Sequence, residues 1–278
     1  MGFTIDGFLD AVDLKEVGAG RYVAGNIDTG HFVVFGGQLL AQSIMAAHAS
    51  QEGKAVKTLH TVFARAASPA KPVEIAVERL HNGRALASCT VTVSQGERLC
   101  ARSMVLLSAD EPDFVRHADR PATPSSPLKA TRRRPQDDGG WEIRVVDGVD
   151  TDDPDAVGPA ELDVWTRCAG APTDRTTAQA LLAYATDGFL IGTAMRPHKG
   201  VGQVMAHKAI STGVLSHTIT FHEPFSAADW LLLEHSSPYA GHGRGYGRAD
   251  VFTEDGRLVA SFVQDNMIRA MPEGSSGL

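Results

Sequence analysis

Residues 256–264 read GRLVASFVQ, and they closely match residues 96–105, which read GERLCARSMV. Each stretch starts at the glycine of a tight turn and continues as an apolar strand. The match extends upstream, because His60 lies 36 residues before this glycine in the first stretch and His217 lies 39 residues before it in the second. We interpret this as an internal duplication with a period of about 160 residues, which indicates two copies of one domain.

Each copy is expected to contain one long helix and a set of antiparallel strands. In the first copy, a helical apolar pattern over 39–48 precedes alternating runs at 58–67, 72–80, 84–94 and 97–108. In the second copy, a strand at 161–168 and an apolar helix at 176–194 precede runs at 216–222, 229–237, 244–253 and 257–269. A single helix beside a sheet must bury its apolar stripe on that sheet, so each copy is predicted to be α+β, with its helix wrapped by strands.

The chain is expected to have three parts. They are a first repeat at 1–109, a linker at 110–140 and a second repeat at 141–271. The linker is placed where prolines and a run of three arginines, Arg132 to Arg134, interrupt the apolar periodicity.

Composition narrows the class of protein. The formal net charge of −7 argues against binding to a nucleic-acid backbone, which requires a basic face. Residues 29–51 carry no charged side chain, but their glycines, glutamines and histidines argue against a membrane span. Three cysteines without a CxxC spacing argue against a disulfide framework or a zinc site. We therefore expect a cytoplasmic protein with no metal, no nucleic-acid partner and no membrane span.

Four motifs stand in a characteristic order along the chain: Phe35-Gly36-Gly37-Gln38, Tyr184-Ala185-Thr186-Asp187, residues 217–225 and residues 255–264. Their order and spacing resemble the acyl-CoA thioesterase II family. The resemblance implies an α+β double hotdog fold. It also implies hydrolysis of acyl-CoA thioesters to free fatty acid and CoA by a directly activated water, with no cofactor.

The resemblance further implies a catalytic set of an Asp, a Gln and a Thr or Ser. By position, Asp187 takes the Asp role and Gln264 takes the Gln role. The hydroxyl position falls on Val214, which departs from the family pattern. Ser216 is the nearest substitute, because it lies two residues further on an extended segment, and Thr212 is another.

The residues themselves leave two interpretations of Asp187. A lone carboxylate among apolar helical residues is costly to bury, and burial would raise its pKa toward that of a general base. Alternatively, Asp187 caps a local break at Gly188 or points toward solvent. Gln264 is equally open: its counterpart in the first repeat is Val105, so it either orients a water or ends a strand as a solvent-facing amide.

Gly37 is a further candidate, for binding the substrate. Gly36 and Gly37 precede a predicted helix, whose first N–H groups have no intrahelical partner and lie at the positive end of the dipole. The Gly37 N–H is therefore predicted to donate to the thioester carbonyl oxygen. The alternative is that the two glycines only permit a tight entry into the helix.

Only the second copy is expected to hold an active site, because the first predicted helix offers Gln38, Gln42 and Ser43 but no acid. Two other functions remain open. One is a degenerate double hotdog that binds acyl-CoA or a protein partner without turnover, which Val214 favours; the other is a hotdog hydratase or dehydratase. Exposed edge strands also lead us to expect a homodimer or a larger homo-oligomer.

Overall fold

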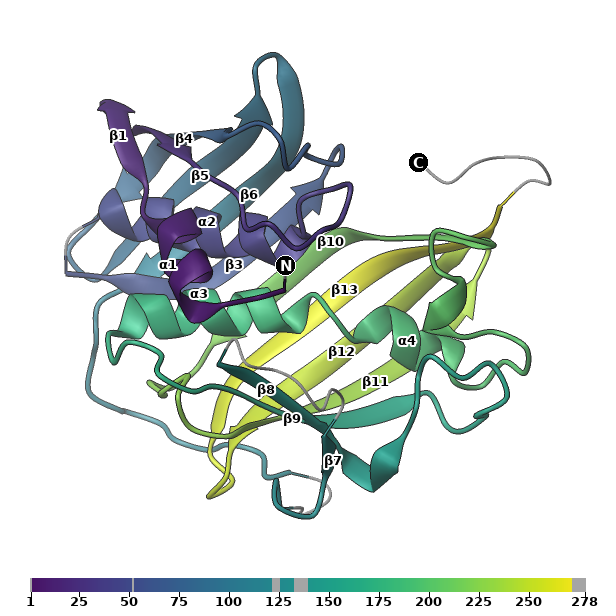
Figure 1. The fold of residues 1–278 in the computed structure, drawn as a ribbon. Coiled ribbons are helices and arrows are strands. Elements are labelled where there is room, and N and C mark those ends of the chain that lie inside the picture. The colour runs from purple at the N-terminus through teal and green to yellow at the C-terminus, as the bar shows by residue number, and fades with distance from the viewer. Residues whose placement is uncertain (1, 52, 122–125, 133–139, 272–278) are drawn as a thin grey trace.

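The computed structural model describes residues 2–51, 53–121, 126–132 and 140–271 (Figure 1). The helices are α1 (Ile5–Val12), α2 (Gly36–Ala49), α3 (Arg175–Thr186) and α4 (Leu190–Met195), with short 3-10 turns η1 (Val146–Gly148) and η2 (Gln203–Met205). The first seven strands are β1 (Lys15–Gly18), β2 (Arg21–Ala24), β3 (Ala55–Phe63), β4 (Val73–Asn82), β5 (Leu86–Gln95), β6 (Arg98–Ser108) and β7 (Thr131–Arg132). The others are β8 (Trp141–Val145), β9 (Glu161–Cys168), β10 (Ile210–Phe221), β11 (Leu231–Gly241), β12 (Arg244–Thr253) and β13 (Leu258–Ala270).

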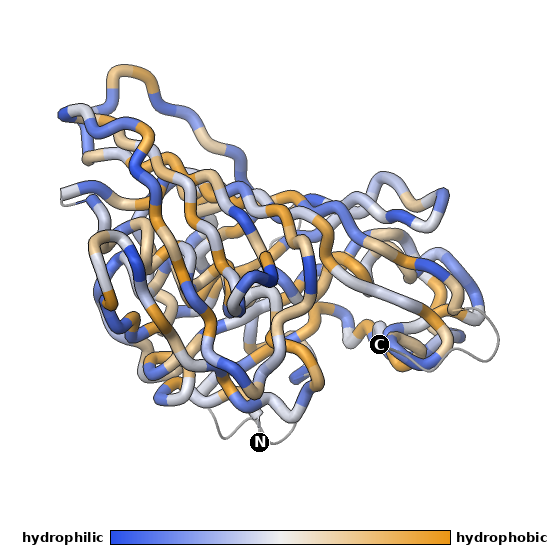
Figure 2. Tube along the Cα trace, turned by 90° about the horizontal axis from the view of Figure 1, so that it is seen from above, coloured by the Kyte–Doolittle hydropathy of each residue, from blue (hydrophilic) through white to orange (hydrophobic). Residues whose placement is uncertain are grey.

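The described strands form one continuous antiparallel sheet. Their order is β1-β2-β4-β5-β6-β3-β10-β13-β12-β11-β9-β8-β7. The two copies join where β3 pairs with β10, with His60 opposite Thr218. The sheet curves around the helices, which lie on one of its faces (Figure 1). Hydrophilic and hydrophobic residues alternate along many of the strands (Figure 2), as expected for a sheet with one face on the core.

The strand register repeats between the copies in detail. In the first copy β3 pairs with β6, and its register shifts between Val56 and Thr58. In the second copy β10 pairs with β13, and its register shifts between Val214 and Ser216. The duplication predicted from the sequence is therefore present in the backbone, down to the position of a β-bulge.

The helices α2 and α3 pack against each other in the centre of the molecule (Figure 1). An aromatic cluster fixes the end of α3, because the ring of Tyr184 lies 4.9 Å from that of Phe35, 5.2 Å from Phe3, 5.3 Å from Trp141 and 5.6 Å from Phe8. These rings come from both copies, so the cluster holds the start of α2 close to the end of α3.

Several elements differ from the sequence-based expectation. The helix predicted at 176–194 is interrupted at Asp187 and Gly188, which separate α3 from α4. The short elements α1, β1 and β2 add to the first copy, and Thr4 caps α1 by accepting from the Gly7 N–H. Strand β7 lies inside the predicted linker, where it pairs with β8. Such short elements carry too little periodicity to be recognised from sequence.

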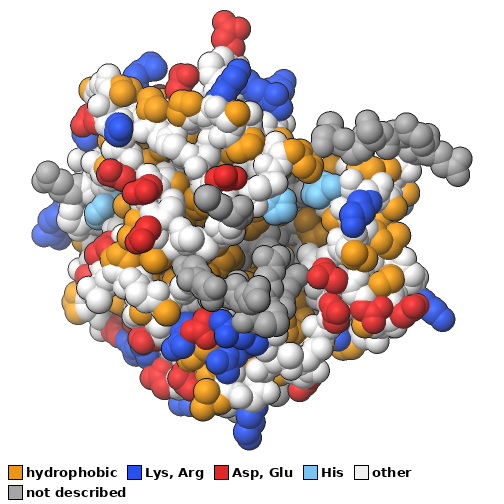
Figure 3. All heavy atoms as spheres, in the orientation of Figure 1, with side chains coloured by type: hydrophobic (Ala, Val, Ile, Leu, Met, Phe, Trp, Pro, Cys, Tyr) orange, Lys and Arg blue, Asp and Glu red, His pale blue; other side chains and the backbone are white. Residues whose placement is uncertain are grey.

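Of the described helices, none is long and apolar enough to cross a bilayer. Acidic and basic side chains are interspersed on the face of the molecule seen in Figure 3.

Candidate active site

Asp187 is the residue at which α3 ends. It is the C-cap, with φ −78° and ψ −4°, and it is partly buried. Its Oδ2 accepts a hydrogen bond of 2.9 Å from the backbone N–H of Gly37. Gly37 lies in the first turn of α2, where backbone N–H groups lack intrahelical partners. The carboxyl group of one copy is therefore held by the helix N-terminus of the other.

This close approach depends on the two glycines of α2. A Cβ added to Gly36 would lie 2.7 Å from Asp187 Oδ2, and one added to Gly37 would lie 2.5 Å from the carbonyl oxygen of Tyr184. Both distances are shorter than real Cβ contacts, and the second is to backbone that cannot move independently. Glycine is thus required for the carboxyl group to reach the amide.

Gln264 approaches Asp187 from the sheet. It lies on β13 and is only 1% exposed. Its Nε2 donates to the carbonyl oxygen of Thr186 at 3.2 Å and lies 3.5 Å from Asp187 Oδ1. Because a carbonyl only accepts, this bond fixes which end of the amide faces α3. No described residue hydrogen-bonds to Gln264 Oε1, which is left as a buried acceptor beside the acid.

His217 stands directly opposite Gln264 on β10 and supports the end of α3. The Thr186 hydroxyl donates to the Ala183 carbonyl, so it must accept from the Nε2–H of His217, 2.9 Å away. The imidazole also stacks on Phe262, with ring centroids 5.5 Å apart. Burial lowers the pKa of His217 to about 3, which keeps the ring neutral and makes it a positioning group.

The environment of Asp187 changes its acidity. Burial raises the pKa of Asp187 to about 7, and the hydrogen bond from Gly37 opposes that rise by favouring the charged form. Near neutral pH the carboxyl group therefore exchanges between its protonated and ionised forms. That is the property of an efficient general base, whose pKa should lie close to the working pH.

Two family models match consecutive parts of the chain. Residues 23–108 match the acyl-CoA thioesterase N-terminal domain, and residues 109–268 match the acyl-CoA thioesterase C-terminal domain. The chain belongs to the acyl-CoA thioesterase II family.

Individual proteins with similar sequences carry acyl-CoA thioesterase names as well. The chain is 28% identical to human acyl-coenzyme A thioesterase 8 over 269 residues, which cover 87% of this chain and 82% of that protein. It is 29% identical to acyl-CoA thioesterase 2 of Haemophilus influenzae over 272 residues, which cover 87% of this chain and 90% of that protein.

Solved structures confirm the double hotdog fold. The acyl-CoA thioesterase II TesB2 from Mycobacterium marinum matches with a TM-score of 0.81 and 25% identity, covering 96% of this chain and all of that one (100%). A hot dog fold protein from Alicyclobacillus acidocaldarius matches with a TM-score of 0.76 and 20% identity, covering 95% and 98% of the two chains. The latter likeness concerns the fold alone.

The structure separates Ser216 from the other predicted site residues. The register pairs Ser216 with Asp265, whose Oδ2 accepts from the serine hydroxyl at 2.9 Å. Neighbouring residues on a strand point to opposite faces, and His217 points toward α3, so Ser216 lies on the outer face of the sheet. The expectation that Ser216 shares a face with residue 214 is therefore wrong, and its predicted role as the substitute for the thioesterase hydroxyl loses that support.

Val214, in contrast, faces the site. It pairs with Asn266, which lies two residues after Gln264 and on the same face of β13. The extra residue at the bulge, Leu215, explains the error, because in a regular strand residues 214 and 216 would share a face. Thr212 lies further along β10, opposite Ile268.

The structure also gives the Gly37 amide a different partner from the expected one. Its N–H donates to Asp187, so it positions the acid instead of the thioester carbonyl oxygen. Asn266 was not recognised as a candidate in the sequence, although a second amide two residues after Gln264, and so on the same face of the predicted strand, was a usable signal.

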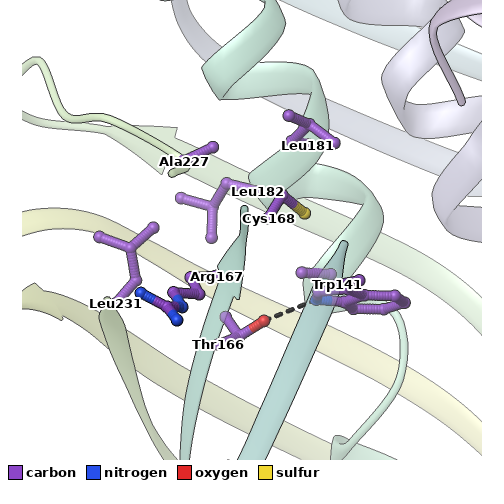
Figure 4. A pocket seen from close by; sticks show the side chains of 9 residues that line it. Trp141, Thr166, Arg167, Cys168, Leu181, Leu182, Ala227 and Leu231 are labelled. Carbon is purple, nitrogen blue, oxygen red and sulfur yellow. Dashed lines mark hydrogen bonds between the residues drawn. The ribbon is translucent and has the colours of Figure 1, made fainter. Parts of the chain in front are cut away.

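A cysteine nucleophile has little support. All three cysteines are buried free thiols, and burial raises the pKa of Cys168 to about 12. Cys168 lines a small pocket whose lining does not include Asp187, and in which the Trp141 indole N–H donates to the Thr166 hydroxyl at 2.6 Å (Figure 4). Within the described residues, no group of three His, Cys, Asp or Glu side chains is arranged to hold a metal ion.

Proposed function

We propose that this chain hydrolyses acyl-CoA thioesters to a free fatty acid and CoA. The observation that carries the proposal is the position of the Asp187 carboxyl group between the Gly37 N–H and the Gln264 amide. Burial raises the pKa of this carboxyl group to about 7. Membership of the acyl-CoA thioesterase II family supports the substrate class.

In the proposed reaction, Asp187 takes a proton from a water as the water oxygen forms a bond to the thioester carbonyl carbon. The bond between that carbon and the CoA sulfur then breaks, and the proton passes from Asp187 to the departing sulfur. The carboxylate is restored, and one water has been consumed. Gln264 Oε1 accepts the second hydrogen of the water, which aims its oxygen at the carbonyl carbon.

The test is the release of free CoA thiol from acyl-CoAs of short, medium and long chain length. We expect turnover by the natural chain and a loss of about 100- to 10,000-fold in kcat for Asp187→Asn, the range typical of a general base. A thermal unfolding scan controls for folding of the variant. Unchanged turnover in Asp187→Asn would contradict the proposed role.

The second candidate function is binding of acyl-CoA without turnover. It is favoured by Val214, which faces the site where the family pattern has a hydroxyl. In the same experiment, saturable binding of acyl-CoA with no thiol release would select this function over hydrolysis.

We also propose that the protein is cytoplasmic and forms a homodimer or a larger homo-oligomer. The free cysteines fit a reducing compartment. Val62 on β3 and Met104 on β6 are 50% and 57% exposed on the outer face of the sheet, where a second copy would cover them. Light scattering on the eluting protein measures the mass, and a monomer would contradict the oligomer.

A further inference from the structure

Asn266 stands out among the buried polar residues. It is 0% exposed, and neither its Oδ1 nor its Nδ2 has a hydrogen-bond partner in the described part of the chain. In the other residues of the described chain with an orphaned buried side-chain atom, such as Gln42 and Gln179, only one atom is affected. Leaving a whole amide unpaired in the interior is destabilising, so an amide at this position calls for a partner that is not part of the fold.

The position of Asn266 ties it to the site. It lies on β13 two residues after Gln264, so both side chains project from the same face. Across the sheet it pairs with Val214 on β10 and with Gly245 on β12. A Cβ added to Gly245 would lie 3.9 Å from the Asn266 Cβ and 3.5 Å from the Ala194 Cβ, which places the amide beneath α4. Helix α4 begins just after Asp187.

The first copy shows that the fold does not require an amide here. The residue in the equivalent register position is Leu107, opposite Val56 next to the equivalent bulge. Leu107 is fully buried. Because leucine satisfies the same backbone position in the copy that lacks the acid, packing alone does not account for Asn266.

We propose that Asn266 is a further catalytic residue, which holds the attacking water together with Asp187 and Gln264. This inference rests on the proposed hydrolysis. The neighbouring strand has Val214 where the family pattern places a hydroxyl, and Asn266 is the residue paired with Val214. The Asn266 amide on β13 thus supplies the hydrogen bond to water that Val214 on β10 cannot form.

The hydrogen-bonding groups are complementary to one water. Its two hydrogens go to Asp187 and to the unpartnered Oε1 of Gln264, and one lone pair of its oxygen accepts from Asn266 Nδ2–H. The second lone pair stays free to attack the carbonyl carbon. Gln264 Nε2 cannot serve as this donor, because it is already directed at Thr186 and Asp187.

The experiment compares Asn266→Leu and Asn266→Ala with the natural protein in the thiol-release assay. Leucine has the same branching as asparagine and is the residue of the first copy, and alanine provides a second variant if leucine does not fold. We expect kcat to fall by about 10- to 100-fold with KM within about 2-fold, and the unfolding temperature to stay the same or rise. Adding Val214→Thr to Asn266→Leu is expected to recover about 10-fold in kcat, since the hydroxyl then supplies the lost contact.

The possible results distinguish a failure of the role of Asn266 from a failure of the proposed hydrolysis. If the natural protein turns over acyl-CoA and Asn266→Leu does so at the same rate, the role of Asn266 is overturned. The proposed hydrolysis is then unaffected. A loss of kcat that Val214→Thr does not recover overturns the placement of the amide beside residue 214. No turnover by the natural protein on any acyl-CoA overturns both.

Discussion

The two copies of the fold share a backbone and differ in a few buried side chains. In the first copy Leu59 pairs with Val105, and Val56 pairs with Leu107. In the second copy the corresponding pairs are His217 with Gln264 and Val214 with Asn266. The same two register positions are therefore apolar in the first copy and mostly polar in the second. On these strands the two copies differ by three side chains, His217, Gln264 and Asn266 in place of Leu59, Val105 and Leu107, at equivalent positions of the strand register.

The C-terminal ends of α2 and α3 also differ, because only α3 ends in a side chain that contacts the other copy. The C-cap of α2 is Ser50, whose hydroxyl donates to the Ala47 carbonyl within its own helix. The C-cap of α3 is Asp187, whose carboxyl group reaches across to Gly37. The first copy thus contributes an N–H donor and a glycine entry, while the second contributes the groups proposed to react.

Apart from replacement of Asp187 itself, the largest effect is expected from adding a methyl group where the two copies meet. In Gly37→Ala the new Cβ would overlap the Tyr184 carbonyl oxygen, so α2 and α3 must separate. We expect a loss of about 100-fold in kcat and of about 1–3 kcal/mol in the free energy of unfolding. Gly25→Ala is the matched control, because a Cβ there meets nothing within 4 Å. Equal behaviour of the two variants would show that the close approach is unnecessary.

The next largest effect is expected from making the second copy resemble the first. Gln264→Val introduces the residue found at position 105 and removes the contacts to Thr186 and Asp187. We expect kcat to fall by about 10- to 100-fold, because a hydrogen bond to a charged group is lost. Steady-state kinetics with a parallel denaturant titration measures both properties. A stable variant with full activity would contradict the assignment of Gln264.

A smaller effect concerns stability. The pKa of Asp187 is about 7 in the folded protein and lies near 3.8 without the fold, so the folded state favours the protonated form. The resulting stabilisation is present in full below the lower value and is lost as the pH rises through about 7. Asp187→Asn should therefore unfold at a higher temperature than the natural protein above neutrality, with the advantage shrinking in acid. An advantage independent of pH would contradict burial of the charge.

The smallest effect is expected on the outer face of the sheet. Ser216→Ala removes a hydroxyl that donates to Asp265 on the outer face of the sheet, away from the site. We expect kcat and KM within about 2-fold of the natural values, since surface substitutions generally have small effects. A large fall in kcat would restore Ser216 to the catalytic set and contradict the strand register.

The features of the molecule that depend on local sequence patterns could be predicted from the sequence. The duplication, most of the helices and strands, and Asp187 and Gln264 as candidate residues follow from periodicity and motif order. The error at Ser216 came from a single bulge residue, Leu215, which reverses the face on which later side chains lie. The hydrogen bond of Gly37 and the unpaired amide of Asn266 depend on neighbours that are distant in sequence. They could therefore not be predicted without the three-dimensional structure.

The most direct measurement is the pH dependence of kcat/KM for acyl-CoA hydrolysis. If Asp187 is the general base, activity rises as the carboxyl group ionises, with a midpoint near pH 7 set by its burial. The residual activity of Asp187→Asn should lack this rise. A profile that is flat around neutrality, or one that keeps the same midpoint in Asp187→Asn, would contradict the role given to this acid.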